Sequence, residues 1–194
     1  MARTIEFDPD QVLHNATRVF WQHGYCMTSI SRLVEATKLN PGSIYSAFKS
    51  KEGLFLATLE YYGQQNRKML QHCLNAAPSP LEGVKSFLQE LLEEMAGDSS
   101  HRGCFLVNTV LEMSPHNKAI QKTALQQLDA LETLLASALQ DAREQGELPQ
   151  EKNPSVLAKY IMVNIWGLRV LSKAGADSEV LRQQVSELLS NLEK

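Results

Sequence analysis

Apolar residues recur along most of this chain at intervals of three to five positions, the spacing that gathers them on one face of a helix. The longest series is Ile120, Leu125, Leu128, Leu131, Leu135, Leu139 and Ala142. Alternation of Val, Ile and Thr is almost absent, and no Asn-Gly or Asp-Gly pair marks a hairpin. The pattern therefore predicts an all-α chain.

Proline marks the predicted helix starts. Five of the seven prolines follow a capping residue, in the pairs Asp8-Pro9, Asn40-Pro41, Ser79-Pro80, Ser114-Pro115 and Asn153-Pro154. The side-chain oxygen of the capping residue accepts a backbone N–H, and proline gives up a donor that the first turn does not pair. With the apolar spacing, these starts predict about nine helices, near residues 8–23, 28–35, 41–46, 51–76, 80–97, 101–113, 116–145, 154–173 and 178–192.

Helix length changes near residue 50. Before it the predicted helices are short and closely connected, and after it they are long, with no Gly/Ser-rich or Pro-rich linker between. We therefore expect two domains, a three-helix module over 1–50 and a larger helical body over 51–194.

Composition limits the function without identifying it. The 194 residues are 43% hydrophobic and 21% charged, with a net charge of −3, which fits a globular protein and excludes one that coats nucleic acid by bulk charge. Residues 1–51 still hold six basic residues against four acidic ones, so a local basic surface remains open. Three widely spaced cysteines, no signal peptide and no apolar run of about 20 residues predict a cytoplasmic protein without a membrane anchor.

The N-terminal module has the spacing of a helix-turn-helix. Gly24 and Tyr25 close the first helix, and Thr28 is expected to cap the second. Residues 37–40 form a turn, after which Pro41 opens a helix of about two turns that suits the major groove. Tight helical corners also occur in enzymes, so the spacing alone leaves DNA binding and an enzyme both open.

The residues of this module, and not only their spacing, resemble those of a known family. The run Leu39-Asn40-Pro41-Gly42-Ser43-Ile44-Tyr45-Ser46-Ala47-Phe48-Lys49-Ser50-Lys51-Glu52-Gly53-Leu54, with Gly24-Tyr25 and Thr28-Ser29-Ile30 before it, resembles the DNA-binding domain of the TetR family of transcriptional repressors. The likeness covers about 45 residues. It implies a repressor that binds a palindromic operator in double-stranded DNA as a homodimer and that a small-molecule effector of unknown identity releases.

The resemblance also implies which residues contact DNA. Thr28 and Ser29 would hold a phosphate at a helix N-terminus, Tyr45 would contact a second phosphate, and Lys51 would supply a further clamp. Gly42 would allow close approach to the groove. The full set of expected DNA contacts is Thr28, Ser29, Arg32, Pro41, Gly42, Ser43, Tyr45, Ser46, Lys49 and Lys51.

Two positions depart from the family pattern. The glycine usual in the turn is Lys38 here, and a left-handed lysine would carry about 1 kcal/mol or more of strain. The aromatic or histidine that commonly follows the tyrosine by two positions is Ala47, which leaves room for a thymine methyl group.

The segment 154–173 is apolar on more than one face. A single helix cannot bury that much apolar surface against the other helices of its own chain. We expect it to pair with the helix near 116–145 and with the same two helices of a second copy, in a four-helix dimer interface. The alternative is a fully buried central helix in a monomer.

Polar residues inside apolar helices are candidates for orienting an effector, and neighbouring aromatic and Met side chains for lining its cavity. The run Gly103–Asn108 resembles one found at the cavity entrance of many TetR-family members. The candidates are Phe87, Met95, Cys104, Phe105, Asn108, Glu112, Met162, Trp166 and Arg169. The alternative for each is an ordinary core position.

Cys104 permits a second kind of trigger. A thiol near His101 and Arg102 at a helix start would have a lowered pKa and could respond to oxidants or electrophiles. A buried structural cysteine is the alternative.

The sequence contains no recognisable catalytic motif, no metal-ligand spacing and no cofactor fingerprint. We therefore predict a non-enzyme without a metal or cofactor. The competing classes are an all-α enzyme and a helical module that binds another protein through the 154–173 surface.

Overall fold

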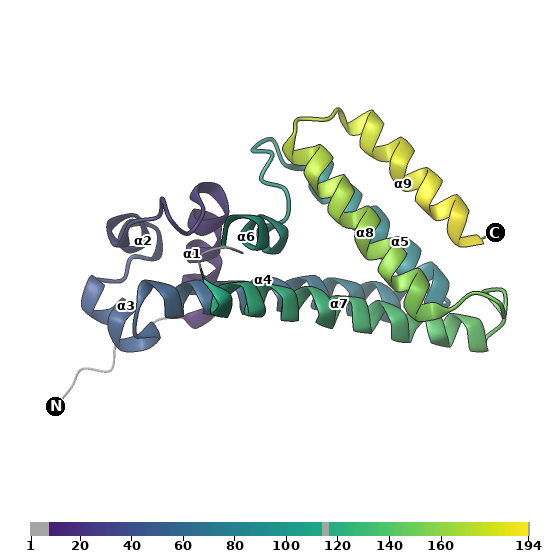
Figure 1. Cartoon of the computed structure of the whole chain (residues 1–194), viewed down its shortest axis with the longest axis horizontal. Helices are drawn as coiled ribbons and strands as arrows, with labels where there is room; N and C mark the ends of the chain where they lie inside the picture. The colour runs from purple at the N-terminus through teal and green to yellow at the C-terminus, as the bar shows by residue number, and fades with distance from the viewer. Residues whose placement is uncertain (1–7, 114–116, 194) are drawn as a thin grey trace. The chain divides into compact units, whose positions relative to one another are not determined.

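The computed structural model describes residues 8–113 and 117–193, and every regular element in those ranges is an α-helix (Figure 1). These are α1 (Pro9–His23), α2 (Ile30–Thr37), α3 (Pro41–Phe48), α4 (Lys51–Ala76), α5 (Pro80–Gly97), α6 (Phe105–Met113), α7 (Lys118–Glu144), α8 (Pro154–Lys173) and α9 (Ser178–Glu193). The predicted all-α fold of nine helices is confirmed. No helix in the described ranges is long and apolar enough to span a membrane.

Side-chain caps begin the helices at the predicted prolines. In each case an oxygen of the capping residue accepts one or two backbone N–H groups of the first helical turn, which have no partner within the helix. The caps seen are Asp8 for α1, Asn40 for α3, Ser79 for α5 and Asn153 for α8. The predicted start at Ser114-Pro115 lies outside the described residues.

Two predicted starts are displaced, and each displacement has a local cause. The cap of α2 is Ser29 rather than Thr28, because the Ser29 hydroxyl accepts the Arg32 N–H at 3.3 Å. The helix expected from residue 101 begins only at Phe105. His101 and Gly103 have φ values of 48° and 71°, which a right-handed helix does not contain.

The described chain divides into two compact units. The first unit consists of the described residues up to Gln64 and of Phe105–Gln127 apart from 114–116, and the second consists of Gln65–Cys104 and of the described residues from Leu128 onward. The first unit therefore holds α1, α2, α3 and α6. The second holds α5, α8 and α9.

An aromatic cluster forms the core of the first unit. The rings of Phe20 on α1 and Phe55 on α4 meet edge to face, with centroids 4.7 Å apart. Phe105, the first residue of α6, packs edge to face on both Phe55 and Tyr62, with centroids 5.6 and 5.7 Å away. Because such contacts stabilise beyond the area they bury, the cluster fixes α6 against α1 and the start of α4.

The helices α5, α8 and α9 pack against one another in the second unit (Figure 1). Buried leucine, isoleucine and valine side chains fill the space between them, among them Leu88, Ile161 and Val185. The Glu147 carboxylate accepts the backbone N–H of Leu81 at 2.8 Å and so adds a second cap to α5.

Candidate nucleic-acid interface

The turn between α2 and α3 has well-defined causes. Lys38 ends α2 because it adopts the left-handed conformation, with φ 60° and ψ 11°, as expected for a position where glycine is usual. Leu39 points inward and is buried. Asn40 then caps α3, with its Oδ1 accepting the N–H of Ser43 at 2.8 Å. The helix-turn-helix predicted from the spacing is confirmed.

The outward face of α3 carries most of the predicted contacts. Pro41, Gly42 and Ser46 are exposed, and Tyr45 exposes 47% of its surface. Ser43 is the exception, since only 8% of it is exposed on the side of α3 that also buries Ile44. Lys49 follows the helix, and its exposed ammonium group donates to the carbonyl of Ser46 at 3.2 Å.

The N-terminus of α2 presents its two hydroxyl residues differently. Thr28 is 2% exposed and donates its hydroxyl hydrogen to the carbonyl of Gly24 at 2.6 Å, so this side chain is engaged inside the fold. Ser29 is exposed, and Arg32 is exposed one turn further on. The Arg32 guanidinium donates to the carbonyl of Met27 at 3.3 Å.

Lys51 connects the start of α4 to the turn between α1 and α2. Its ammonium group donates to the carbonyls of Tyr25 and Thr28, both at 3.0 Å, and lies 4.3 Å from the centre of the Tyr25 ring. An ammonium group has three donors, so one remains beyond these two carbonyls. The predicted clamp on phosphate stays a prediction, and the side chain also has a role in holding the turn.

The same turn is held from the side of α6. The Glu112 carboxylate accepts the backbone N–H groups of Tyr25 and Cys26, at 3.2 and 3.0 Å. Glu112 was expected to orient an effector, but both of its oxygens are engaged by the backbone here. Sequence reasoning had no signal for this contact, because the bonded residues are 86 and 87 positions apart.

The effector candidates fall in both units. Phe105, Asn108 and Glu112 belong to the first unit. The second unit holds the other six, which are Phe87, Met95, Cys104, Met162, Trp166 and Arg169.

Arg169 and Trp166 have contrasting environments in the second unit. Arg169 is buried, and its guanidinium binds both oxygens of Glu94, at 3.3 and 2.9 Å. The indole N–H of Trp166 is buried without a hydrogen-bond partner among the described residues. A buried donor without a partner is unfavourable, which makes this N–H a place where a ligand oxygen would be stabilised.

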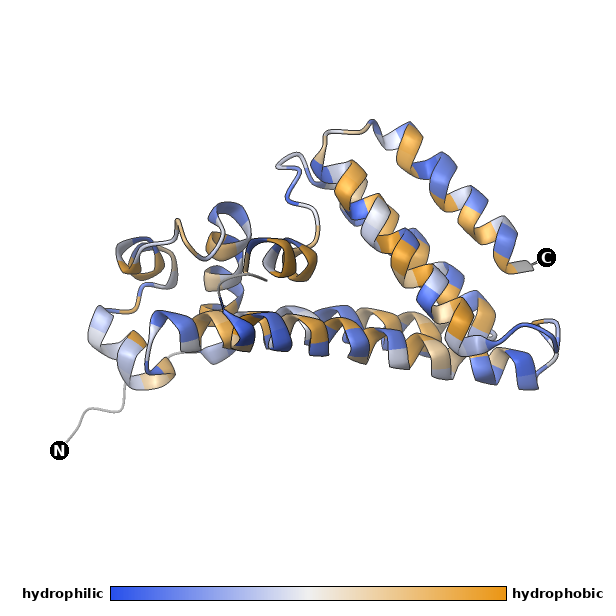
Figure 2. Ribbon diagram, viewed as in Figure 1, coloured by the Kyte–Doolittle hydropathy of each residue, from blue (hydrophilic) through white to orange (hydrophobic). Residues whose placement is uncertain are grey.

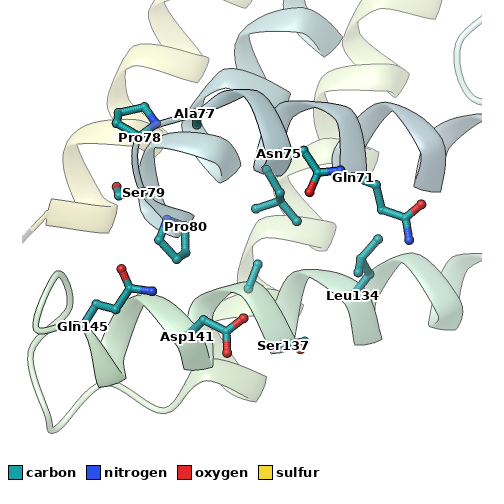
Figure 3. A pocket seen from close by; sticks show the side chains of 12 residues that line it. Gln71, Asn75, Ala77, Pro78, Ser79, Pro80, Leu134, Ser137, Asp141 and Gln145 are labelled. Carbon is teal, nitrogen blue, oxygen red and sulfur yellow. The ribbon is translucent and has the colours of Figure 1, made fainter.

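A hollow of about 470 Å³ lies elsewhere in the second unit, between the end of α4, the corner before α5 and the C-terminal half of α7 (Figure 3). Asn75, Asp141 and Gln145 bring polar groups to its rim, while Leu134 and Ala138 contribute apolar surface. Its other lining residues are Gln71, Leu74, Ala77, Pro78, Ser79, Pro80 and Ser137. No predicted effector residue lines it. The prolines and small side chains at this corner are the only sequence signal that could have indicated it.

The three cysteines differ in exposure. Cys26 is exposed, whereas Cys73 and Cys104 are buried. Burial, together with the hydrogen bond and negative charge of Glu90, raises the pKa of the Cys73 thiol to about 11. Local desolvation of the thiol, followed by the hydrogen bond and negative charge of Glu112, raises the pKa of Cys26 even though this residue is exposed, and the charge of Lys51 opposes that shift. Neither thiol is therefore activated at neutral pH.

Both parts of the chain match known families. A model of bacterial regulatory proteins of the tetR family matches residues 12–58, and a model of the tetracyclin repressor-like C-terminal domain matches residues 80–188. These two segments enclose the helix-turn-helix and most of the body.

Relatives are similar over nearly their whole length. The transcriptional repressor ComR of Escherichia coli (strain K12) is 30% identical over 91% of this chain and 85% of its own. The uncharacterized regulator YezE of Bacillus subtilis (strain 168) is 29% identical over the full length of both chains. A cysteine mutant of the regulator CifR, solved with 26-bp double-strand operator DNA, superposes with a TM-score of 0.85 at 31% identity, over 97% of this chain and 98% of the other.

Proposed function

Because this chain belongs to the TetR family of bacterial transcriptional regulators, we propose that it binds a palindromic operator as a homodimer and leaves it when a small-molecule effector binds. It is a helix-turn-helix repressor that binds operator DNA, and it is not an enzyme. The observation that carries the proposal is the exposed outer face of α3, which presents Tyr45, Ser46 and Lys49 to solvent.

On this proposal α3 enters the major groove. Ser46 lies toward base edges, while Tyr45 and Lys49 bind phosphates and so fix the register of the helix on the duplex. Gly42 allows the first turn of α3 to approach closely. Thr28 and Ser43 are assigned a supporting part, because their hydroxyl-bearing side chains are buried in the fold.

The outer side of α8 supports the dimer. Val156, Tyr160, Val163 and Val170 repeat at helical spacing, and the two valines at 156 and 163 expose 66% and 56% of their surface. Much of the α8 ribbon is coloured as hydrophobic in Figure 2. This stripe argues against the alternative of a central helix buried on all sides. An exposed apolar stripe of this kind is typical of an interface. We assign it, with α7 beside it, to contact with the same helices of a second copy, which would set two α3 helices about 34 Å apart.

Trp166 supports a binding site for the effector inside the second unit. Its buried N–H without a partner favours a ligand with a hydrogen-bond acceptor, and the nearby Met162 on the same helix offers an adaptable apolar wall. To reverse operator occupancy from 99:1 to 1:99, the effector must prefer the non-binding conformation by about 5.5 kcal/mol.

DNA binding can be tested with the DNA upstream of the chain's own gene in a gel-shift assay at low salt. We expect binding by the wild type and clearly weaker binding by Tyr45→Phe and by Lys51→Ala. Because Lys51 also holds the turn, circular dichroism must show that the Lys51→Ala variant stays folded. A wild-type protein that binds no palindromic duplex would contradict the proposal.

The location of the effector site can be tested with any small molecule that releases the wild type from DNA. Trp166→Phe removes the indole donor, and Ala138→Trp places a large side chain in the hollow of Figure 3, which Trp166 does not line. We expect only Trp166→Phe to weaken release. Loss of release in Ala138→Trp alone would move the site to the hollow.

Burial favours a non-covalent trigger over a thiol trigger, because only 8% of Cys104 is exposed. The two can be separated by treating the DNA-bound protein with peroxide or a quinone and then identifying modified cysteines by mass spectrometry. Release with Cys104 modified, and its absence in Cys104→Ser, would establish the thiol trigger. Release with Cys104 intact would exclude it.

A further inference from the structure

The turn between α1 and α2, Gly24–Cys26, is held by two charged side chains from outside the helix-turn-helix. Lys51 of α4 takes the carbonyl of Tyr25, and Glu112 of α6 takes the N–H groups of Tyr25 and Cys26. The positive Lys51 therefore binds an acceptor of the turn, and the negative Glu112 binds two of its donors. The segment they fix continues directly into Thr28, Ser29 and the first turn of α2.

The Glu112 carboxylate lies close to the backbone of Gly24. Gly24 has φ +73°, and a Cβ atom placed on it would lie 2.7 Å from one Glu112 carboxylate oxygen and 3.0 Å from the other. A side chain at position 24 would therefore have to displace the carboxylate from the turn, and the positive φ of this residue independently favours glycine. Bonds from backbone N–H groups to a carboxylate are charge-assisted and stronger than those to a neutral acceptor.

The contact also depends on the chemistry of the side chain. A carboxylate offers two acceptor oxygens, and here each accepts one N–H of the turn. A glutamine amide has nearly the same size but only one acceptor oxygen, and its NH₂ group would face the second N–H. Glutamate at position 112 is therefore not replaceable by its closest isostere.

Building on the operator binding described above, we propose that Glu112 is a positioning residue for the DNA-binding surface. It touches no DNA. It holds the Gly24–Cys26 turn, which sets the N-terminus of α2, so operator binding requires α6 to keep its place within the first unit. Glu112 thereby acts in coupling α6 to DNA and not in contacting the effector.

If Glu112 acted only through its negative charge, its removal would strengthen binding to DNA, the opposite of the effect expected for a positioning residue. Each negative charge near the DNA-binding surface repels phosphate, so its neutralisation strengthens binding slightly. Loss of positioning weakens binding. The sign of the change in affinity therefore separates the two roles.

The test compares Glu112→Gln with Glu60→Gln, a matched charge removal at an exposed position on α4 in the same unit. Fluorescence anisotropy with the upstream operator gives the affinity over a range of salt concentrations. We expect about tenfold weaker binding for Glu112→Gln, with an unchanged salt slope because no phosphate contact is lost. Glu60→Gln should bind as tightly as the wild type or slightly more tightly.

Amide hydrogen exchange provides a readout that does not depend on DNA. Exchange at Tyr25 and Cys26 should be faster in Glu112→Gln and unchanged in Glu60→Gln, while the core of α5 keeps its protection. Unchanged exchange at the turn, or affinity for DNA equal to that of Glu60→Gln, would overturn the role of Glu112. A wild type that binds no operator would refute the proposed function instead, and the exchange data would still decide whether Glu112 holds the turn.

Discussion

At the scale of single residues, the helix-turn-helix contains backbone strain at the ends of α2 and α3, where non-glycine residues have positive φ values. Lys38 and Lys49 both have positive φ values, 60° and 71°, at the ends of α2 and α3. A side chain in this region costs about 1–2 kcal/mol relative to glycine. Both lysines are exposed next to the DNA-binding face, which suggests that their charge is kept at the expense of stability.

We therefore expect Lys38→Gly to raise the free energy of unfolding by about 1 kcal/mol. Urea denaturation followed by circular dichroism measures the change. Lys38→Ala is the matched control, because it removes the same charge but keeps a Cβ atom and hence the strain. Equal stabilities of the two variants would show that the left-handed conformation is not strained.

The Asp98–Arg102 pair closes the loop between α5 and α6. Burial opposes ionisation of Asp98, but the backbone N–H and guanidinium of Arg102, with the N–H of Ser100, lower the pKa of this carboxyl below 3.8. A carboxyl whose pKa is lower in the folded state stabilises the fold at pH above its unfolded pKa, and that contribution is lost as pH falls through the folded pKa.

We expect Asp98→Asn to lower stability by about 1 kcal/mol at pH 7 and by much less near pH 3. Thermal unfolding at the two pH values measures this, with Glu93→Gln, exposed on α5, as the control for charge. A difference between wild type and Asp98→Asn that stays constant from pH 7 to pH 3 would contradict the assigned role.

At the scale of elements, α8 combines two surfaces. Its inner face, which includes Ile161 and Arg169, packs in the second unit, whereas Val156, Val163 and Val170 remain exposed in the single chain. Gly167 lies in the same exposed stripe, and a Cβ atom there would meet nothing within 4 Å. A small residue at that point allows a neighbouring helix to approach closely.

Val163→Asp is therefore expected to convert a dimer into a monomer, because it would bury a carboxylate against apolar side chains. Sedimentation velocity at micromolar concentration distinguishes the two forms. Gln89→Asp, which adds the same charge at an exposed position of α5, should remain dimeric. A Val163→Asp protein that sediments as the wild type would place the interface elsewhere.

At the scale of the whole molecule, operator binding must overcome a net charge of −3. Affinity then depends on a few exposed cations near α3, and each phosphate contact contributes about 0.9 to the slope of log K against log salt concentration.

Lys49→Gln should accordingly weaken binding and reduce this slope by about one. Tyr45→Phe should weaken binding without changing the slope, since the lost hydroxyl carries no charge. Anisotropy titrations between low and physiological salt give both quantities, and Lys68→Gln, exposed on α4 in the second unit, provides the control. If Lys49→Gln leaves the slope unchanged, Lys49 does not bind phosphate.

Local signals predicted most of the fold, because capping and apolar spacing act within a few residues. The caps at Asn40 and Ser79 are of this kind, whereas the left-handed conformation of Lys38 was raised only by comparison with the family pattern, which has glycine there. The late start of α6 escaped prediction because a loop with two positive φ values precedes it. The outward face of α3 followed from the motif, but the burial of the Thr28 hydroxyl and the engagement of Glu112 depend on contacts between distant segments, which no local pattern encodes.

Because Glu112 approaches Gly24 so closely, the residues that evolution tolerates at position 112 depend on the residue at position 24. A lineage that acquires any side chain at position 24 displaces the carboxylate, and selection on the glutamate is then relaxed or reversed. Descendants of this gene that lose Gly24 should therefore lose the glutamate as well, whereas the positive φ of Gly24 favours glycine even where Glu112 has been replaced. An α6 segment that carries the glutamate should function only in a recipient that keeps glycine at position 24.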